Sequence, residues 1–223
     1  MAAALDLSFV NDIMNSNKKS YTDKILDYII TNLNSLNAKD NYTARHSLKV
    51  GEYSLGIAAK MGLAEEEKIK ILIAGVLHDI GKIMIPNSIL KKTGRLNEEE
   101  FKIIKSHSYL GYEATKLFKE LSELGIPELI LYHHERVDGK GYPLGVTDTI
   151  IPIGSRIISA ADSYDAMTTT RTYRIGFDHY SAVNELITHS NAQFDRNVIY
   201  NIFLYFKENE FFMGKRTSLL LQC

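Results

Sequence analysis

The chain has 223 residues, of which 45% are hydrophobic and 24% are charged, proportions that are ordinary for a globular protein. Its formal net charge of -1 excludes bulk electrostatic attraction to nucleic acid or to an anionic membrane. The only cysteine, Cys223, excludes an intrachain disulfide and fits a reducing compartment. The first ten residues lack the pattern of a signal peptide. We therefore expect a cytoplasmic protein that binds neither nucleic acid nor membrane.

Apolar residues recur at helical spacing along the first half of the chain. This periodicity predicts helices over residues 21–36, 43–61 and 65–81. Residues 1–20 are polar and less periodic, which is typical of either a short helix or a loose lead-in. The sequence has no convincing alternating pattern of β-strands, so we predict an all-α fold.

The second half of the chain carries clear signals for helix starts. Asn97 followed by three glutamates at 98–100 predicts a capping box and a long helix through Phe118. Pro127 suits the first turn of a helix that reaches His134. The remaining elements are a glycine-rich loop at 137–150 and helices at 153–167, 181–189 and 195–210.

Histidine and aspartate residues lie on the apolar faces of these predicted helices. Five of the 7 histidines belong to this set, whereas His179 and His189 are expected on the surface or at helix ends. One such histidine is most simply a hydrogen-bonded structural residue, but each unpartnered polar group in a core costs about 2–7 kcal/mol. Convergence on a cation removes this cost. The predicted metal ligands are His46, His78, Asp79, His107, His133, His134 and Asp162.

The adjacent pairs of ligands indicate more than one metal ion. Neighbouring residues on a helix point about 100° apart, so they do not duplicate each other's contacts. We therefore expect the Asp79 carboxylate to bridge two ions. As a hypothesis, one ion takes His46, His78, Asp79 and Asp162, and the other takes Asp79, His107, His133 and His134.

Two divalent ions held in this way can activate a water molecule and hold a phosphodiester for in-line attack. They carry more charge than Asp79, Asp162 and one hydroxide remove, so a near-neutral protein would gain one positive pocket for an anion. The ligand set contains no thiolate and suits iron or manganese, with zinc, nickel or cobalt as substitutes. Because no Ser/His/Asp or Cys/His set is evident, the pattern favours metal-dependent hydrolysis.

Several short runs of sequence together carry a specific resemblance. They include KDNYTARHS at 39–47, LHDIGK at 77–82, SHSYLG at 106–111, HHERVDGKGYP at 133–143 and RIISAADSYDAMTTTRTYR at 156–174. The chain resembles the HD-GYP subfamily of HD-domain phosphohydrolases. This resemblance implies an HD-domain helical bundle with a metal site in its core. It also implies bacterial signalling through hydrolysis of cyclic di-GMP to pGpG, GMP or both.

On this basis we expect a helical lead-in over residues 1–38, an HD-GYP domain over 39–210 and a C-terminal tail over 211–223. Some family members carry a glutamate four residues before the first histidine and bind a third ion. Tyr42 stands at this position, so the resemblance favours two ions of iron or manganese.

The resemblance also assigns roles to individual residues. It implies that the seven predicted ligands hold the metal ions. Asp79 and Lys82 are then catalytic residues, with Lys82 contacting the phosphate or the metal-bound oxygen. Arg171 and Arg174 match basic residues that hold the phosphates of the cyclic dinucleotide.

The residues themselves leave other interpretations open. Lys82 is also explained as a cation at a helix C-terminus, and Arg171 and Arg174 are also explained by surface salt bridges. Arg136 either contacts the substrate or pairs with a neighbouring aspartate. Tyr142 either stacks on a base or anchors the glycine-rich loop as a large amphipathic side chain.

Two other functions are compatible with the sequence. One is hydrolysis of another cyclic dinucleotide, such as cyclic GMP–AMP, or of a nucleoside phosphate, because no motif in the sequence indicates which nucleobase is recognised. The other is a non-catalytic sensor of cyclic dinucleotides or a scaffold. A diguanylate cyclase or a regulatory protein is a partner to consider. Regulatory domains are common in the family, so the chain either works alone or is a piece of something longer.

Overall fold

The computed structural model describes residues 5–16, 22–170 and 175–208. These residues contain no β-strand, which confirms the predicted all-α fold. The predicted tail at 211–223 lies outside the described residues. No helix within the described ranges combines the length and the hydropathy needed to cross a membrane.

The helices follow one another with short connections except for one long loop before α10. In chain order they are α1 (Ser8–Ser16), α2 (Thr22–Lys39), α3 (Asn41–Lys60), α4 (Glu65–Leu77), the 3-10 helix η1 (Ile80–Met84), α5 (Asn87–Leu90), α6 (Glu98–Lys105), α7 (His107–Lys116), α8 (Lys119–Glu123), α9 (Ile126–Leu131), α10 (Ile153–Thr168), α11 (His179–Thr188) and α12 (Arg196–Glu208).

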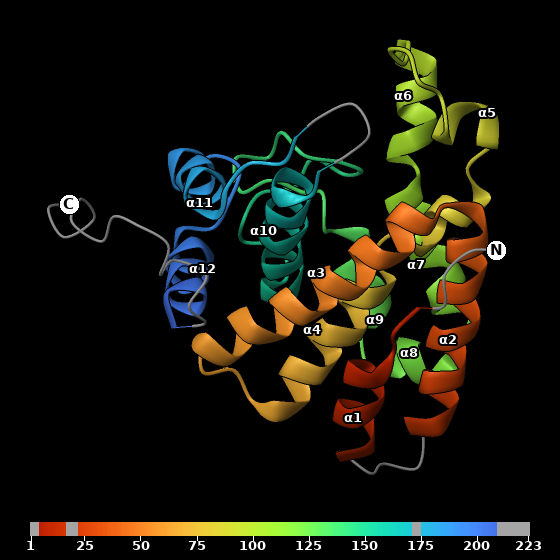
Figure 1. The fold of residues 1–223 in the computed structure, drawn as a ribbon, viewed down its shortest axis with the longest axis horizontal. Helices are drawn as coiled ribbons and strands as arrows, with labels where there is room; N and C mark the ends of the chain where they lie inside the picture. The colour runs from red at the N-terminus through yellow and green to blue at the C-terminus, as the bar shows by residue number, and fades with distance from the viewer. Residues whose placement is uncertain (1–4, 17–21, 171–174, 209–223) are drawn as a thin grey trace, which may run out of the picture.

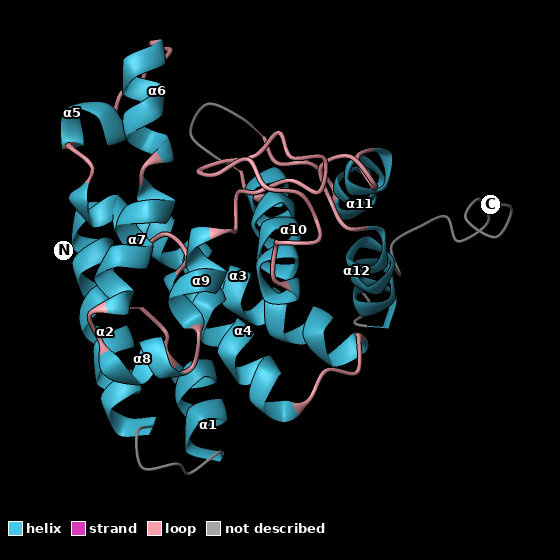
Figure 2. Ribbon diagram, turned by 180° about the vertical axis from the view of Figure 1, so that it is seen from behind, coloured by secondary structure: helices cyan, strands magenta, loops and turns pink. Residues whose placement is uncertain are grey.

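The pair α3 and α4 forms the centre of the bundle (Figure 1). Helix α10 packs against both of them, α2 and α12 pack against α3, and α9 packs against α4. Helix α7 lies against α9 and η1. From behind, the long loop between α9 and α10 is seen to run beside α10 (Figure 2). The elements that carry the predicted ligands therefore meet in the middle of the molecule.

The core is built from the predicted apolar stripes. Ile25, Ile29, Leu33 and Leu36 of α2 have no exposed surface. All seven residues of the segment 71–77 in α4 are buried, so this part of the helix is surrounded on all sides. Full burial of such a large apolar side chain stabilises a fold by about 1.5–3 kcal/mol. Because α4 is central, the residues that follow it directly are also inside the bundle.

Two predicted helices end before their metal-ligand pairs, which corrects the sequence interpretation. The helix predicted over 65–81 ends at Leu77, and the helix predicted to reach His134 ends at Leu131. Just beyond the first helix, His78 donates its Nδ1–H to the carbonyl oxygen of Gly75 at 2.7 Å. Beyond the second, His133 donates in the same way to the carbonyl oxygen of Ile130 at 2.6 Å. These bonds satisfy carbonyl groups that are left unpaired at a helix end.

The long helix predicted over 97–118 is also wrong, because Ser106 separates α6 from α7. The Ser106 hydroxyl donates to the carbonyl oxygen of Ile103 at 2.7 Å. His107 Nδ1 donates to that of Ile104, also at 2.7 Å. Such side-chain bonds compete with the helical backbone ladder. His107 consequently begins α7 with only 1% of its surface exposed.

Other predicted helix ends are confirmed. The Asn97 side chain accepts from the Glu100 amide at 2.8 Å, and the Glu100 side chain accepts from the Asn97 amide at 2.9 Å, so the capping box is present. Helix α1 shows that the N-terminal region contains a short helix. His179 begins α11 and His189 caps its C-terminal end.

Helices α5 and α6 extend beyond the rest of the bundle (Figure 1). No residue of α6 is buried, although Phe101 on this helix is large and apolar. Because α6 leads into α7 through Ser106 alone, this projecting pair stands next to the element that carries His107.

Gly81 determines how closely η1 approaches α7. A β-carbon at this position would overlap the carbonyl oxygen of His107 and lie 2.6 Å from the amide nitrogen of Gly111. Both neighbours are backbone atoms, so no rotation of a side chain can make room. The close approach keeps Asp79, two residues before Gly81, beside His107.

We expect Gly81→Ala to lower the free energy of unfolding by about 1–3 kcal/mol, because the added methyl group must push η1 away from α7. Chemical denaturation followed by circular dichroism measures this change. Gly94→Ala is the matched control, because a β-carbon at Gly94 meets no atom within 4 Å. Wild-type stability in Gly81→Ala would contradict the close approach.

Candidate metal centre

The predicted ligands come from five parts of the fold and meet at one place. Their side chains are buried or half-buried, and most of them have 6% of their surface exposed or less. Helix α3 supplies His46, the turn between α4 and η1 supplies His78 and Asp79, α7 supplies His107, the end of α9 leads to His133 and His134, and α10 supplies Asp162.

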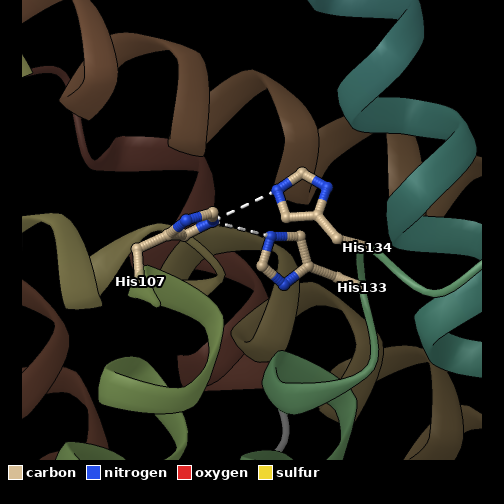
Figure 3. A group of neighbouring side chains, drawn as sticks. All are labelled: His107, His133 and His134. Atoms are coloured by element: carbon tan, nitrogen blue, oxygen red, sulfur yellow. Dashed lines mark hydrogen bonds between the residues drawn. The ribbon is translucent and has the colours of Figure 1, made fainter. Parts of the chain in front are cut away.

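Three of the histidines form one compact group. His107, His133 and His134 each place a ring nitrogen within 4.8 Å of the others (Figure 3). His107 Nε2 lies 3.3 Å from His133 Nε2 and 3.1 Å from His134 Nε2. A second group of the same compactness contains His46, His78 and Asp79. Together the two groups contain six of the seven predicted ligands, and Asp162 belongs to neither of them.

The hydrogen bonds at the helix ends fix the tautomers of three of these rings. His78, His107 and His133 each point Nδ1 at the carbonyl oxygen three residues earlier, at 2.7, 2.7 and 2.6 Å. A carbonyl oxygen only accepts, so Nδ1 must carry the hydrogen. In a neutral ring held in this way, Nε2 presents a lone pair to the centre.

This arrangement leaves electron-pair donors facing one another. Burial lowers the pKa of His107 to about 4 and that of His133 well below its ordinary value, so both rings are neutral. Their Nε2 atoms then meet as two acceptors at 3.3 Å. The Nε2 atom of His78 and the Oδ1 atom of Asp79 are also buried without a hydrogen-bond partner among the described residues. Neutral imidazole nitrogens and carboxylate oxygens that converge in this way fit divalent cations.

Asp79 lies between the two groups. Its Oδ2 atom is 3.3 Å from His78 Nε2 and 2.7 Å from Lys82 Nζ, whereas its Oδ1 atom is 3.3 Å from His107 Nε2. Burial alone would raise the pKa of this carboxyl group, but the ammonium group of Lys82 holds it well below its usual range. The carboxylate is therefore charged and has one oxygen for each group, as a bridging ligand requires.

Asp162 completes the group around His46. Its Oδ1 atom is 2.8 Å from His46 Nε2 and 4.0 Å from His78 Nε2, and 17% of its side chain is exposed. The ring of Tyr42 stacks on His46 with centroids 5.9 Å apart. A tyrosine thus occupies the place where a glutamate would add a further carboxylate.

Asp165 is a buried carboxylate that sequence reasoning missed. Its Oδ2 atom lies 2.7 Å from His46 Nδ1, so it orients the ring and directs Nε2 toward Asp162. Burial would lower the pKa of His46, but the two aspartates raise it to about 9 in the absence of a cation. The signal was available, because Asp165 lies three residues after Asp162 on one face of α10.

Lys82 is a charged residue at the edge of the centre. Burial would lower the pKa of its ammonium group, but the carboxylate of Asp79, 2.7 Å away, raises it. The Lys82 side chain is 22% exposed. Its ammonium group pairs directly with a predicted metal ligand, so a helix end alone does not explain its position.

The glycine-rich loop is fastened to the centre through Tyr142. The Tyr142 ring stacks on the His134 ring with centroids 4.6 Å apart and an angle of 30°. The Tyr142 amide donates to the His134 carbonyl oxygen at 3.1 Å. This side chain accordingly forms one wall of the centre, next to the predicted ligands.

Glu135 is a second residue that sequence reasoning missed. Its carboxylate is 3% exposed and accepts from the amides of Leu144, Gly145 and Val146 at 2.6, 3.0 and 3.2 Å. Glu135, which directly follows His134, therefore anchors the loop beside the predicted ligands. Its place directly after the histidine pair gave no sign of a partner nine to eleven residues away.

The remaining predicted substrate residues are not part of these groups. The Arg136 guanidinium donates to Asp138 at 2.9 and 2.7 Å and to Gln193 at 3.1 Å, which is the pairing given as one of its two interpretations. Arg171 and Arg174 lie outside the described residues.

We expect Glu135→Gln to lower the free energy of unfolding by about 1–3 kcal/mol, because an amide cannot accept all three backbone N–H groups. Limited proteolysis should also cleave the loop at 136–147 faster than in the wild type. Glu128→Gln is the matched control, because Glu128 is an exposed acid on α9. Unchanged stability and cleavage in Glu135→Gln would contradict the anchoring role.

Known proteins are similar to this chain in sequence and in fold. The HD domain family model matches residues 30–198. A cyclic di-GMP phosphodiesterase of Thermotoga maritima is 42% identical over 153 residues, which are 66% of this chain and 41% of that protein. The 3'3'-cGAMP-specific phosphodiesterase 2 of Vibrio cholerae is 33% identical over 198 residues, which are 89% of this chain and 37% of that protein. The chain thus spans less than half of the length of these relatives.

A solved structure supports the same architecture. Bd1817, a HDG"Y"P protein from Bdellovibrio bacteriovorus, superposes with a TM-score of 0.61 at 17% identity, covering 88% of this chain and 67% of that one. At this identity the likeness concerns the fold alone. The chain belongs to the HD domain family, and its resemblance to the HD-GYP subfamily is confirmed.

Proposed function

We propose that this chain hydrolyses cyclic di-GMP to pGpG, GMP or both at a centre of two divalent metal ions. The observation that carries the proposal is the pair of ligand groups joined by the two oxygens of Asp79. A relative named as a cyclic di-GMP phosphodiesterase shares 42% identity with this chain, which supports the choice of substrate.

The ligand set also supports the choice of metal. One ion would be held by His46, His78, Asp79 and Asp162, and the other by Asp79, His107, His133 and His134. The donors are imidazole nitrogens and carboxylate oxygens without thiolates, which favours iron or manganese. When bound, such a pair of ions activates water and neutralises the charge on a phosphodiester.

The protein's own groups then have separate tasks. Asp79 keeps its negative charge in the core because Lys82 lies 2.7 Å away. Lys82 keeps its positive charge for the same reason and is available to a phosphate oxygen. Tyr142 covers one side of the centre and limits the access of water. Arg171 and Arg174, which lie outside the described residues, are expected to hold phosphates.

A second candidate substrate is 3'3'-cGAMP, because a relative named for that specificity is 33% identical over 89% of this chain. A third possibility is a sensor that binds a cyclic dinucleotide without cleaving it. The expectation of a diguanylate cyclase or another regulatory partner stays a prediction, as do the division of the chain at residues 38 and 210 and its cytoplasmic location.

Turnover measurements separate these functions. Protein loaded with manganese, or with iron kept reduced without oxygen, is incubated with cyclic di-GMP, 3'3'-cGAMP and bis(4-nitrophenyl) phosphate, and products are separated by chromatography. We expect cyclic di-GMP to be cleaved faster than 3'3'-cGAMP. Faster cleavage of 3'3'-cGAMP would assign the second substrate, and binding of both without cleavage would assign the sensor.

We expect Asp79→Ala to lose at least one equivalent of metal and to reduce hydrolysis by more than about 100-fold, because its carboxylate serves both groups. Elemental analysis and product chromatography measure the two effects. Asp148→Ala is the control, because Asp148 is exposed in the loop before α10. Normal metal content with full activity in Asp79→Ala would refute the bridging role.

Arg171→Ala should act on substrate binding alone. We expect the KM for cyclic di-GMP to rise about tenfold, equivalent to one charge-assisted hydrogen bond to phosphate, while metal content stays normal. Steady-state kinetics and elemental analysis test this expectation. Loss of metal from this variant would show that the arginine belongs to the metal site instead.

A further inference from the structure

A cyclic dinucleotide presents two phosphodiesters on opposite sides of its ring. While one of them lies at the metal centre beside Lys82, the other must point away from it. This second phosphate also carries a full negative charge, which a cation of the protein close to the metal ligands would stabilise. The choice of that cation rests on the proposed function.

Lys105, the last residue of α6, is suitably placed. Its Nζ atom lies 5.2 Å from the centroid of the Tyr142 ring and 4.6 Å from that of Phe101. Tyr142 in turn stacks on His134, so Lys105 contacts a ring that lies directly against a predicted metal ligand. The C-terminal end of α6 therefore brings a cation close to the predicted metal ligands.

The charge of Lys105 is not neutralised by an acid. No carboxylate in the described part of the chain lies within the 4.0 Å ion-pairing distance of its Nζ atom. By contrast, Lys92 pairs with Glu100 at 2.6 Å, and Lys102 pairs with Glu99 at 2.9 Å. Aromatic faces orient an ammonium group without cancelling its charge. Lys105 thus keeps three hydrogen-bond donors for an anion.

We propose that Lys105 binds the phosphate of the cyclic dinucleotide that is not being cleaved. Phe101 and Tyr142 already orient its ammonium group beside the predicted metal ligands. Its contribution is confined to substrates that carry a second phosphate. A substrate with a single phosphodiester occupies the metal centre and leaves Lys105 without a ligand.

This difference between substrates provides the test. Manganese-loaded wild type, Lys105→Gln, Lys105→Arg and Lys102→Gln are compared on cyclic di-GMP and on bis(4-nitrophenyl) phosphate, which has one phosphate. We expect Lys105→Gln to raise the KM for cyclic di-GMP about tenfold. The kcat for cyclic di-GMP and both constants for bis(4-nitrophenyl) phosphate should remain within about twofold of wild type.

The other variants separate binding from a structural role. Lys105→Arg keeps the charge and should restore most of the affinity. Lys102→Gln removes a cation from the same helix. The Lys102 side chain is 71% exposed, so this variant should behave as the wild type. An equal loss of kcat/KM on both substrates in Lys105→Gln would overturn the proposal, because it would show that Lys105 only supports Tyr142. An unchanged KM for cyclic di-GMP would overturn it too.

The proposed function and the role of Lys105 can fail separately. If the wild type cleaves bis(4-nitrophenyl) phosphate but no cyclic dinucleotide, the proposed function is wrong. Calorimetric titration of cyclic di-GMP into the manganese-loaded proteins then decides on Lys105. About tenfold weaker binding to Lys105→Gln supports the proposal. Equal affinity, or no binding to the wild type, overturns it.

Discussion

The structure depends on electron-pair donors that face one another in the core with no proton between them. His107 and His133 each use Nδ1 to donate to a carbonyl group, so their Nε2 atoms meet as acceptors at 3.3 Å. A buried acceptor without a partner costs about 1–3 kcal/mol. The charged carboxylate of Asp79 lies at the same place. Only cations satisfy all of these groups at once, so the metal centre and the middle of the core are the same part of the molecule.

The same hydrogen bonds shape the helices and the site. Three histidines follow or begin a helix and donate Nδ1 to a carbonyl oxygen three residues earlier. Each bond satisfies a carbonyl at a helix boundary, fixes the tautomer of the ring and aims Nε2 inward. The ends of α4 and α9 and the start of α7 therefore coincide with the positions of predicted metal ligands. Gly81 then allows η1 and α7 to approach closely enough for ligands from different elements to meet.

A second layer of residues connects the centre to the surface. Asp165 orients His46 from behind, and Glu135 fastens the glycine-rich loop through three backbone amides. Through this loop, Tyr142 lies over His134 and meets Lys105 on its outer face. The loop, the projecting helix α6 and the predicted ligands are thus in contact, although they are separate in the chain.

The sequence by itself determined the helical class and the capping box at Asn97, and through residue types and resemblance it predicted a ligand set. These properties follow from the periodicity and composition of residues that are neighbours in the sequence. Only the tertiary structure decided the break at Ser106, because the break accompanies the burial of His107 against His133 and His134, which come from another part of the chain. It also decided the partners of Asp165 and Glu135. The ring that Asp165 orients is 119 residues away, and a contact over such a distance exists only after the helices have packed.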